Sequence, residues 1–265
     1  MTRASGDVQE TLTGCLKELH LPAFRLGYEE LARQAQQEAL SYEQYLLGLA
    51  HRECQERRDR RTERLLRDSR LPLEKSWPAL DLKRLPPKVV QQMRSLLEGS
   101  FVDRRENVLV FGVPGSGKTH LLCALAQELV RSGRKAQFWT TGLLVQELLV
   151  AKRDLKLSRV LKRLSGYEVL LLDDLGYVQQ NREEMEVLFT LLAERYERGS
   201  VLLTSNLPFS GWEAIFKDAM TPAAAIDRLV HHCVIVELNI PSYRAEQAKK
   251  AKQVRPAATA DEGGT

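Results

Sequence analysis

The run Gly112–Thr119 (GVPGSGKT) matches G-x-x-x-x-G-K-[ST], a pattern whose glycines let backbone N–H groups wrap phosphate oxygens. It follows the apolar run Val108–Phe111 and precedes the helical stretch His120–Arg131, so it is predicted to join a strand to a helix N-terminus, which favours anions. We expect the Lys118 ammonium to reach the β- and γ-phosphates of a nucleotide and the Thr119 hydroxyl to bind Mg²⁺. The residues predicted to hold the nucleotide here are Gly112, Val113, Pro114, Gly115, Ser116, Gly117, Lys118, Thr119 and His120.

Two carboxylates follow a second apolar run, Val169–Leu172. Ligands of open α/β sheets collect at the carboxyl ends of the strands, so Asp173 is predicted to hold the metal. Asp174 is the candidate base that polarises an attacking water. The bland alternative is that both acids only end a strand before a turn.

Two more positions would complete a hydrolytic site. Asn206 ends the apolar run Val201–Thr204 and could hydrogen-bond the water or the γ-phosphate, although a turn residue before Pro208 would look the same. Arg228 is a candidate arginine finger, a group that stabilises charge in phosphoryl transfer. Its alternative is a surface ion pair with a neighbouring acid.

Short apolar runs alternate with helical patterns through the second half of the chain. This alternation predicts the α/β class, with a parallel sheet covered by helices on both faces. The predicted strands are Val108–Phe111, Ala136–Trp139, Val169–Leu172, Val201–Thr204 and Cys233–Leu238.

The N-terminal part reads as a small, charged, all-helical region. Ser41 and Gln44 have capping-box spacing and predict a helix start. The stretch Arg52–Arg70 holds eight arginines and five acids. Four of the arginines recur at spacings that place them on one helix face, where they could contact nucleic-acid phosphates, although interspersed acids are equally typical of an ion-paired, solvated face. The four are Arg57, Arg58, Arg61 and Arg64.

These patterns divide the chain into a helical domain (1–72), a linker or strap with a helix (73–106), an α/β domain (107–248) and a disordered tail (249–265). The formal net charge is +4, which by itself decides little about partners. No apolar run of membrane-spanning length and no secretory signal is visible, so no membrane association is expected. Four widely spaced cysteines argue against a zinc site and favour a reducing, cytoplasmic setting.

The order of motifs resembles the IstB-like transposition helper ATPases of bacterial insertion sequences, which belong to the AAA+ class and are related to DnaC-type helicase loaders. The resemblance rests on GVPGSGKTH, LLLDDLGY, LLTSNLPFSGW, AIDRLVHH and Pro241-Ser-Tyr-Arg244. It implies an AAA+ P-loop fold with a truncated lid. It also implies that Lys118 and Thr119 form Walker A, Asp173 and Asp174 form Walker B, Asn206 is sensor 1, Arg228 is the trans-acting finger and Arg244 is sensor-2-like.

The resemblance further implies an ATPase that uses ATP and Mg²⁺, assembles with ATP into a homo-oligomer on duplex DNA, and recruits a partner transposase. A DnaC-type helicase loader is the main rival. A nucleotide-switched binding protein with little catalysis is a third possibility, because Asp174 stands where AAA+ proteins usually have Glu. Asp174→Glu is accordingly expected to retain or raise ATP turnover.

Overall fold

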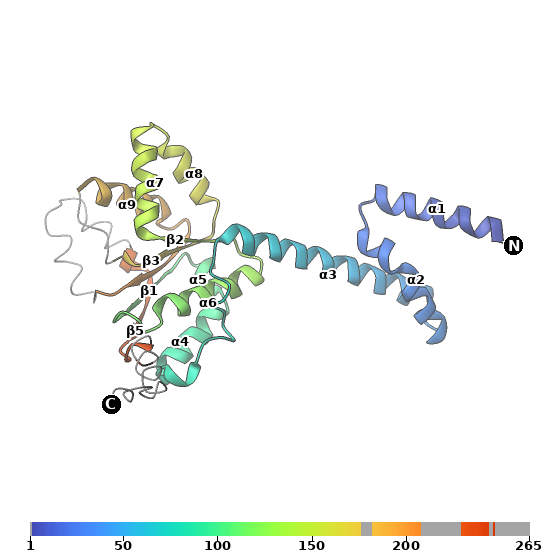
Figure 1. Ribbon diagram of the computed structural model, residues 1–265, viewed down its shortest axis with the longest axis horizontal. Coiled ribbons are helices and arrows are strands. Elements are labelled where there is room, and N and C mark those ends of the chain that lie inside the picture. Colours follow the sequence, from blue (N-terminus) through green and yellow to red (C-terminus); the bar gives the residue numbers. More distant parts are fainter. Residues whose placement is uncertain (1, 176–181, 208–228, 244–245, 247–265) are drawn as a thin grey trace, which may run out of the picture. The chain divides into compact units, whose positions relative to one another are not determined.

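The computed structural model describes residues 2–175, 182–207, 229–243 and 246 (Figure 1). The chain forms two compact units, Met1–Arg64 and Leu65–Thr265. Within the described ranges, no helix is long and apolar enough to cross a membrane.

The N-terminal unit is built from helices, as predicted. The Ser41 hydroxyl accepts from the Gln44 N–H at 3.2 Å, and the Gln44 side chain accepts from the Ser41 N–H at 2.8 Å, so the predicted capping box is confirmed. Leu16, Ala23 and Leu49 are buried between the helices. The helices are α1 (Thr2–Glu18), α2 (Pro22–Gln37) and α3 (Tyr42–Ser69), the last of which extends beyond this unit.

A buried carboxylate from α3 caps the start of α2. The N-cap residue of α2, Leu21, has no side chain that could accept a hydrogen bond. Glu53 supplies the acceptor instead, because its Oε2 accepts from the Ala23 N–H at 2.8 Å. Arg57 then bonds Glu53 Oε1 at 2.8 Å and the His20 carbonyl at 2.7 Å. Glu53 and Arg57 therefore fasten the α1–α2 turn to α3.

The second unit contains a five-stranded sheet in the order β2-β3-β4-β1-β5, and every neighbouring pair is parallel. All five predicted strands are confirmed to within one residue at each end. Their bounds are β1 (Asn107–Gly112), β2 (Ala136–Thr140), β3 (Val169–Asp173), β4 (Ser200–Ser205) and β5 (Cys233–Leu238).

Helices cover both faces of this sheet, as expected for buried parallel strands (Figure 1). Side chains alternate along β1, so Val108 and Val110 join the cluster under α4 and α6, whereas Leu109 and Phe111 join the cluster under α7, α8 and α9. The helices of this unit are α4 (Pro87–Leu97), α5 (Ser100–Asp103), α6 (Lys118–Arg131), α7 (Thr141–Arg153), α8 (Leu157–Ser165) and α9 (Arg182–Arg195), with a short 3₁₀ helix η1 (Leu82–Arg84).

The proline-rich stretch 71–86 forms a strap on α6. Trp77 and Leu80 pack against the core cluster, as the sequence suggests for anchoring residues. The buried Gln127 side chain of α6 donates to the carbonyls of Pro72 and Lys75 at 3.0 and 3.1 Å. The strap is thus fixed to the helix that begins at the glycine-rich loop.

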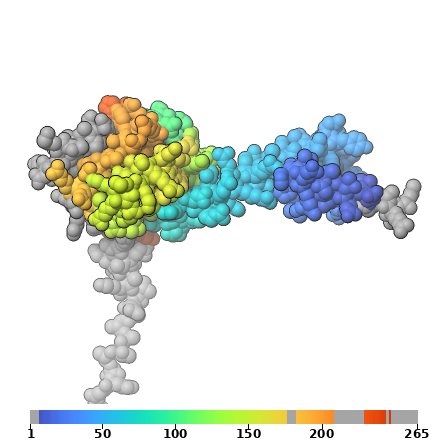
Figure 2. Space-filling view, turned by 90° about the horizontal axis from the view of Figure 1, so that it is seen from above, coloured from blue at the N-terminus to red at the C-terminus, as the bar shows by residue number. Residues whose placement is uncertain are grey.

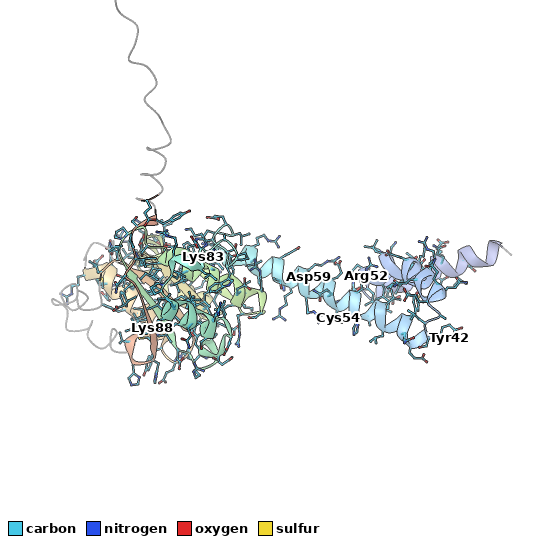
Figure 3. All side chains as sticks on the ribbon, turned by 90° about the horizontal axis from the view of Figure 1, so that it is seen from below. Tyr42, Arg52, Cys54, Asp59, Lys83 and Lys88 are labelled. Carbon is cyan, nitrogen blue, oxygen red and sulfur yellow. The ribbon has the colours of Figure 1, made fainter. Side chains whose placement is uncertain are left out.

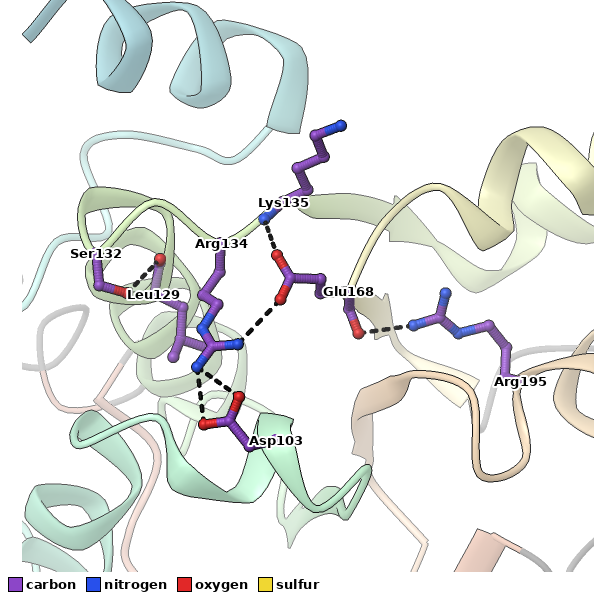
Figure 4. A network of polar contacts seen from close by, with 7 residues as sticks. All are labelled: Asp103, Leu129, Ser132, Arg134, Lys135, Glu168 and Arg195. Atoms are coloured by element: carbon purple, nitrogen blue, oxygen red, sulfur yellow. Dashed lines mark hydrogen bonds and ion pairs between the residues drawn. The ribbon is translucent and has the colours of Figure 1, made fainter. Parts of the chain in front are cut away.

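The amino edge of the sheet is held by arginines (Figure 4). Arg134 pairs with Glu168 at 3.0 Å and with Asp103 at 2.8 Å. Arg195, at the end of α9, is 4% exposed. Its guanidinium donates to four carbonyls, those of Leu164 (3.2 Å), Tyr167 (2.6 Å), Glu168 (2.9 Å) and Ser200 (3.0 Å).

Candidate nucleotide-binding site

The glycine-rich loop leaves β1 at the carboxyl edge of the sheet and enters α6. A Cβ on Gly112 would lie 2.7 Å from the Leu238 carbonyl oxygen, so only glycine fits this close approach to β5. Gly117 has φ +98° at the N-cap of α6, a conformation that side chains disfavour. The backbone therefore requires glycine at these two positions for steric reasons alone.

Lys118 lies in the first turn of α6 and is 5% exposed. Its ammonium donates to the Gly112 carbonyl at 2.8 Å and to the Val113 carbonyl at 3.1 Å. The charge is therefore held within the loop that the sequence predicts to wrap phosphates.

A hydroxyl–carboxylate–hydroxyl set lies beside the loop. Asp173 Oδ1 accepts from Thr119 Oγ1 at 2.8 Å and from Thr204 Oγ1 at 2.6 Å. Asp173 is 8% exposed, and its own carbonyl accepts from the Thr141 hydroxyl at 2.8 Å. The structure thus brings the two predicted metal ligands, Thr119 and Asp173, into direct contact. Hard oxygen donors of this kind are those that Mg²⁺ prefers.

Asp174 and Asn206 end the two neighbouring strands β3 and β4. Asp174 is exposed at φ +60°, a left-handed conformation that Asp tolerates better than most residues, and its N–H donates to Thr204 Oγ1 at 2.8 Å. Asn206 is half-buried, and its Oδ1 is buried without a hydrogen-bond partner among the described residues. Both predicted water-orienting residues therefore follow strands that end beside Asp173.

The residues present fit a phosphate ligand and Mg²⁺. Ser116 Oγ is buried in the loop with no hydrogen-bond partner in the described chain, and buried polar atoms of native proteins are seldom left in that state. Of the other loop positions, Val113 and Pro114 are exposed. His120 is oriented away from this role, because its Nε2 lies 3.1 Å from the Ser76 carbonyl of the strap.

A contact that the sequence did not predict joins the loop to the segment after β5. The Tyr243 N–H donates to the Gly115 carbonyl at 2.9 Å. Arg84 lies 4.8 Å from the centroid of the Tyr243 ring and pairs with Glu246 at 2.8 Å. We call Arg84, Tyr243 and Glu246 the latch, since they connect η1, the glycine-rich loop and the segment after β5.

Two predicted site residues, Arg228 and Arg244, lie outside the described residues, as does the predicted disordered tail. The latch and Thr204 were missed in the sequence. Thr204 stands two residues before Asn206 in the run TSN, and a hydroxyl at a strand end was a usable signal. The Arg84–Glu246 pair spans 162 positions and leaves no local pattern.

The four arginines predicted to contact nucleic acid lie on α3 and differ in their partners. Arg57 is held by Glu53 and the His20 carbonyl, and Arg58 bonds the Gln55 side chain at 2.9 Å. Arg61 and Arg64 are exposed and make no side-chain hydrogen bond or ion pair within the described chain. Figure 3 labels Arg52 and Asp59 on the same helix, where bases alternate with acids.

Comparison with known proteins agrees with this site. The profile of the family described as IstB-like ATP binding protein matches residues 14–251. An insertion sequence ATP-binding protein of Sinorhizobium fredii is 39% identical over 248 residues, which cover 92% of this chain and 83% of the relative. The insertion sequence IS21 ATP-binding protein of Pseudomonas aeruginosa is 38% identical over 245 residues, covering 91% and 90%.

Solved structures share the fold at low identity. The crystal structure of DnaI superposes with a TM-score of 0.54 at 22% identity, covering 64% of this chain and 95% of DnaI. The five-stranded parallel sheet flanked by helices is the AAA+ fold that the resemblance implied. With its ATP-binding loop in place on that fold, the chain belongs to the IstB-like ATP-binding proteins of insertion sequences.

Proposed function

We propose that this ATP-binding protein hydrolyses ATP with Mg²⁺ and acts as a transposition helper on duplex DNA. The observation that carries the catalytic part is the contact of Asp173 with both Thr119 and Thr204, directly beside the glycine-rich loop. Mg²⁺, when bound, would neutralise charge on the phosphate oxygens, and Thr119 and Asp173 are the residues that would hold it.

Lys118 would transfer its hydrogen bonds from the Gly112 and Val113 carbonyls to phosphate oxygens, since charged partners are the stronger acceptors. Asp174 and Asn206 would orient the water that attacks the γ-phosphorus and accept its proton, with ADP as the leaving group. Arg228 of a neighbouring subunit would complete the site, so that turnover would depend on assembly, and Arg244 is the proposed sensor-2-like contact.

We infer duplex DNA as the macromolecular ligand, since the curated relatives are named as insertion sequence proteins. Arg61 and Arg64 are the best-suited contacts of the four predicted arginines, because their guanidinium groups are exposed and not held by a carboxylate. Arg57 supports the α1–α2 turn instead. The transposase recruited to such a complex would be encoded by the same element.

The test is binding of long duplex and single-stranded DNA, with and without ATP and Mg²⁺, followed by imaging of the complexes. ATP-dependent assemblies on duplex, with turnover stimulated by that DNA, are the expected result. A preference for single strands would favour the helicase-loader alternative, and assembly with no turnover would favour a nucleotide-switched binding protein. Either result would overturn the proposal.

A further inference from the structure

The turn between α7 and α8 carries a concentration of positive charge outside the nucleotide site. Residues 152–163 hold six basic side chains and one acid, Asp154. Charge of this density is common on solvated helices, so its meaning depends on how the cations are partnered and where they point. We call the following residues the basic turn: Lys152, Arg153, Leu155, Lys156, Arg159, Lys162 and Arg163.

Packing directs these cations outward. The apolar side of α8 contributes Leu164 to the buried cluster on this face of the sheet, and Leu157, Val160 and Leu161 pack against it. Because apolar residues at helical spacing occupy the inner face, the basic residues of α8 lie on the outer one. Figure 2 shows the yellow-green surface of α7 and α8 facing the viewer.

Half of the cations are not neutralised. Lys152 pairs with Glu186 at 2.9 Å, Lys156 with Asp154 at 3.2 Å, and Arg163 with Glu147. The side chains that make no ion pair or hydrogen bond within the described ranges are those of Arg153, Arg159 and Lys162, all exposed. This surface therefore has positive charge to offer to an anionic partner.

The tip of the turn carries a leucine where the backbone favours glycine. The Lys156 N–H bonds the Ala151 carbonyl at 2.7 Å and the Leu155 N–H bonds the Lys152 carbonyl at 3.2 Å, which is a Schellman motif. Leu155 occupies its left-handed position at φ +59°, where a Cβ is strained, and its side chain is 92% exposed.

Neither conformation nor packing accounts for a leucine at this position. The other non-glycine residues with positive φ in the described chain are polar, charged or alanine: His20, Ala39, Arg70, Arg105, Asp174 and Glu197. Leu155 is thus a large apolar side chain, held outward on a strained backbone between unpaired cations.

We propose that the basic turn is a second DNA-contacting surface, in which Arg153, Arg159 and Lys162 contact phosphates and Leu155 packs into a groove and helps to bend the duplex. The inference rests on the proposed function. Unpaired cations release counterions from the phosphate backbone when they bind, and apolar wedges are a known means of kinking base steps. A protein partner would be less well matched to a tip flanked by unpaired positive charges.

The charge part is tested with the variant Arg153→Ala/Arg159→Ala/Lys162→Ala in the full-length chain with ATP and Mg²⁺. Binding of a fluorescent duplex is measured at several salt concentrations. We expect weaker binding and a log K against log salt slope reduced by about two to three, since each phosphate contact contributes about 0.9. The matched control, Lys152→Ala/Lys156→Ala/Arg163→Ala, removes the same charge from paired positions and should change the slope less.

Two failures are distinguishable. If the unmodified chain does not bind duplex DNA, the proposed function falls and this inference falls with it. If the chain binds, Arg61→Ala/Arg64→Ala lowers the slope and the basic-turn variant keeps it, the inference alone is overturned.

Leu155→Gly tests the wedge separately from folding. Glycine relieves the left-handed strain, so the unfolding midpoint should be unchanged or higher. Energy transfer between dyes at the two duplex ends should nevertheless show less bending, with the salt slope retained, and Leu155→Met should preserve the bend. Equal bending by the unmodified and Leu155→Gly proteins would exclude the wedge.

Discussion

Lys118 and Arg195 are buried cations at opposite edges of one sheet, and both donate to backbone carbonyls. Their exposed fractions are 5% and 4%. Lys118 bonds two carbonyls of its own loop, whereas Arg195 bonds four carbonyls from the segments that lead into β3 and β4. Lysine has a flexible stem with a point charge, and arginine a rigid fork with fixed donors.

The difference separates a movable cation from a structural one. Lys118 can change partners without disturbing the sheet, because the carbonyls that it leaves belong to the loop around it. Arg195 cannot, since each of its carbonyls would be left buried without a donor. Burial raises the free energy of its charged form, and together with the nearby Arg105 lowers the pKa of Arg195 to about 10, so the group remains charged at neutral pH.

Arg195→Met should have the largest effect. Several buried carbonyls would lose their donors, which predicts a loss of about 3–5 kcal/mol in the free energy of unfolding, measured by denaturant titration. Arg198→Met is the matched control, because Arg198 is an exposed neighbour that pairs with Glu194. Equal stability of the two variants would show that the Arg195 network is not structural.

Lys118→Met should give the opposite profile. Two charge-assisted phosphate contacts would be lost, which predicts ATP binding weakened by about 100-fold or more, measured by calorimetry. The unfolding midpoint should change little, because the loop carbonyls can be solvated. A large loss of stability with ATP affinity retained would reverse the roles assigned to the two cations.

Arg57 extends the comparison to the N-terminal unit. Arg57→Ala removes the donor to the His20 carbonyl and should lower the stability of this unit by about 1–2 kcal/mol, whereas Arg61→Ala should leave it unchanged. Hydrogen exchange of α1 and α2 amides measures the difference. Equal protection in both variants would contradict a supporting role.

The same contact has a pH signature. Burial raises the pKa of Glu53, but hydrogen bonds from Arg57 and from the backbone N–H groups of Ala23 and Phe24 outweigh it and hold that pKa below 4.5. A depressed carboxyl pKa stabilises the fold above its unfolded value, so this contribution should be lost as pH falls below about 4.5. Glu53→Gln should flatten that part of the curve.

Arg84→Ala should produce the smallest change. The latch reaches the loop only through the Tyr243 backbone, so loss of the Arg84–Glu246 pair is expected to weaken ATP binding by no more than about tenfold. Glu246→Ala should match it, and the double variant should not add to either. Additive losses would show that Arg84 and Glu246 act independently.

The strands and the glycine-rich loop were predictable because their signals are local. Apolar runs gave all five strands, and the capping box at Ser41 marked the start of α3. The partners of individual cations were not predictable. Arg57, Arg61 and Arg64 share one sequence pattern, yet only the fold shows that Arg57 is held by Glu53. Likewise, nothing local distinguishes Arg195 from an exposed helical arginine.

The central claim is that Thr119 and Asp173 hold Mg²⁺ for ATP hydrolysis, and Asp173→Asn tests it most directly. Nucleotide affinity and phosphate release are measured with and without Mg²⁺ for the unmodified chain and the variant. We predict that the variant still binds nucleotide in the absence of Mg²⁺ but loses both the strengthening by Mg²⁺ and turnover, since the amide lacks the charge that the metal requires. Unchanged Mg²⁺ dependence and turnover in Asp173→Asn would contradict the account.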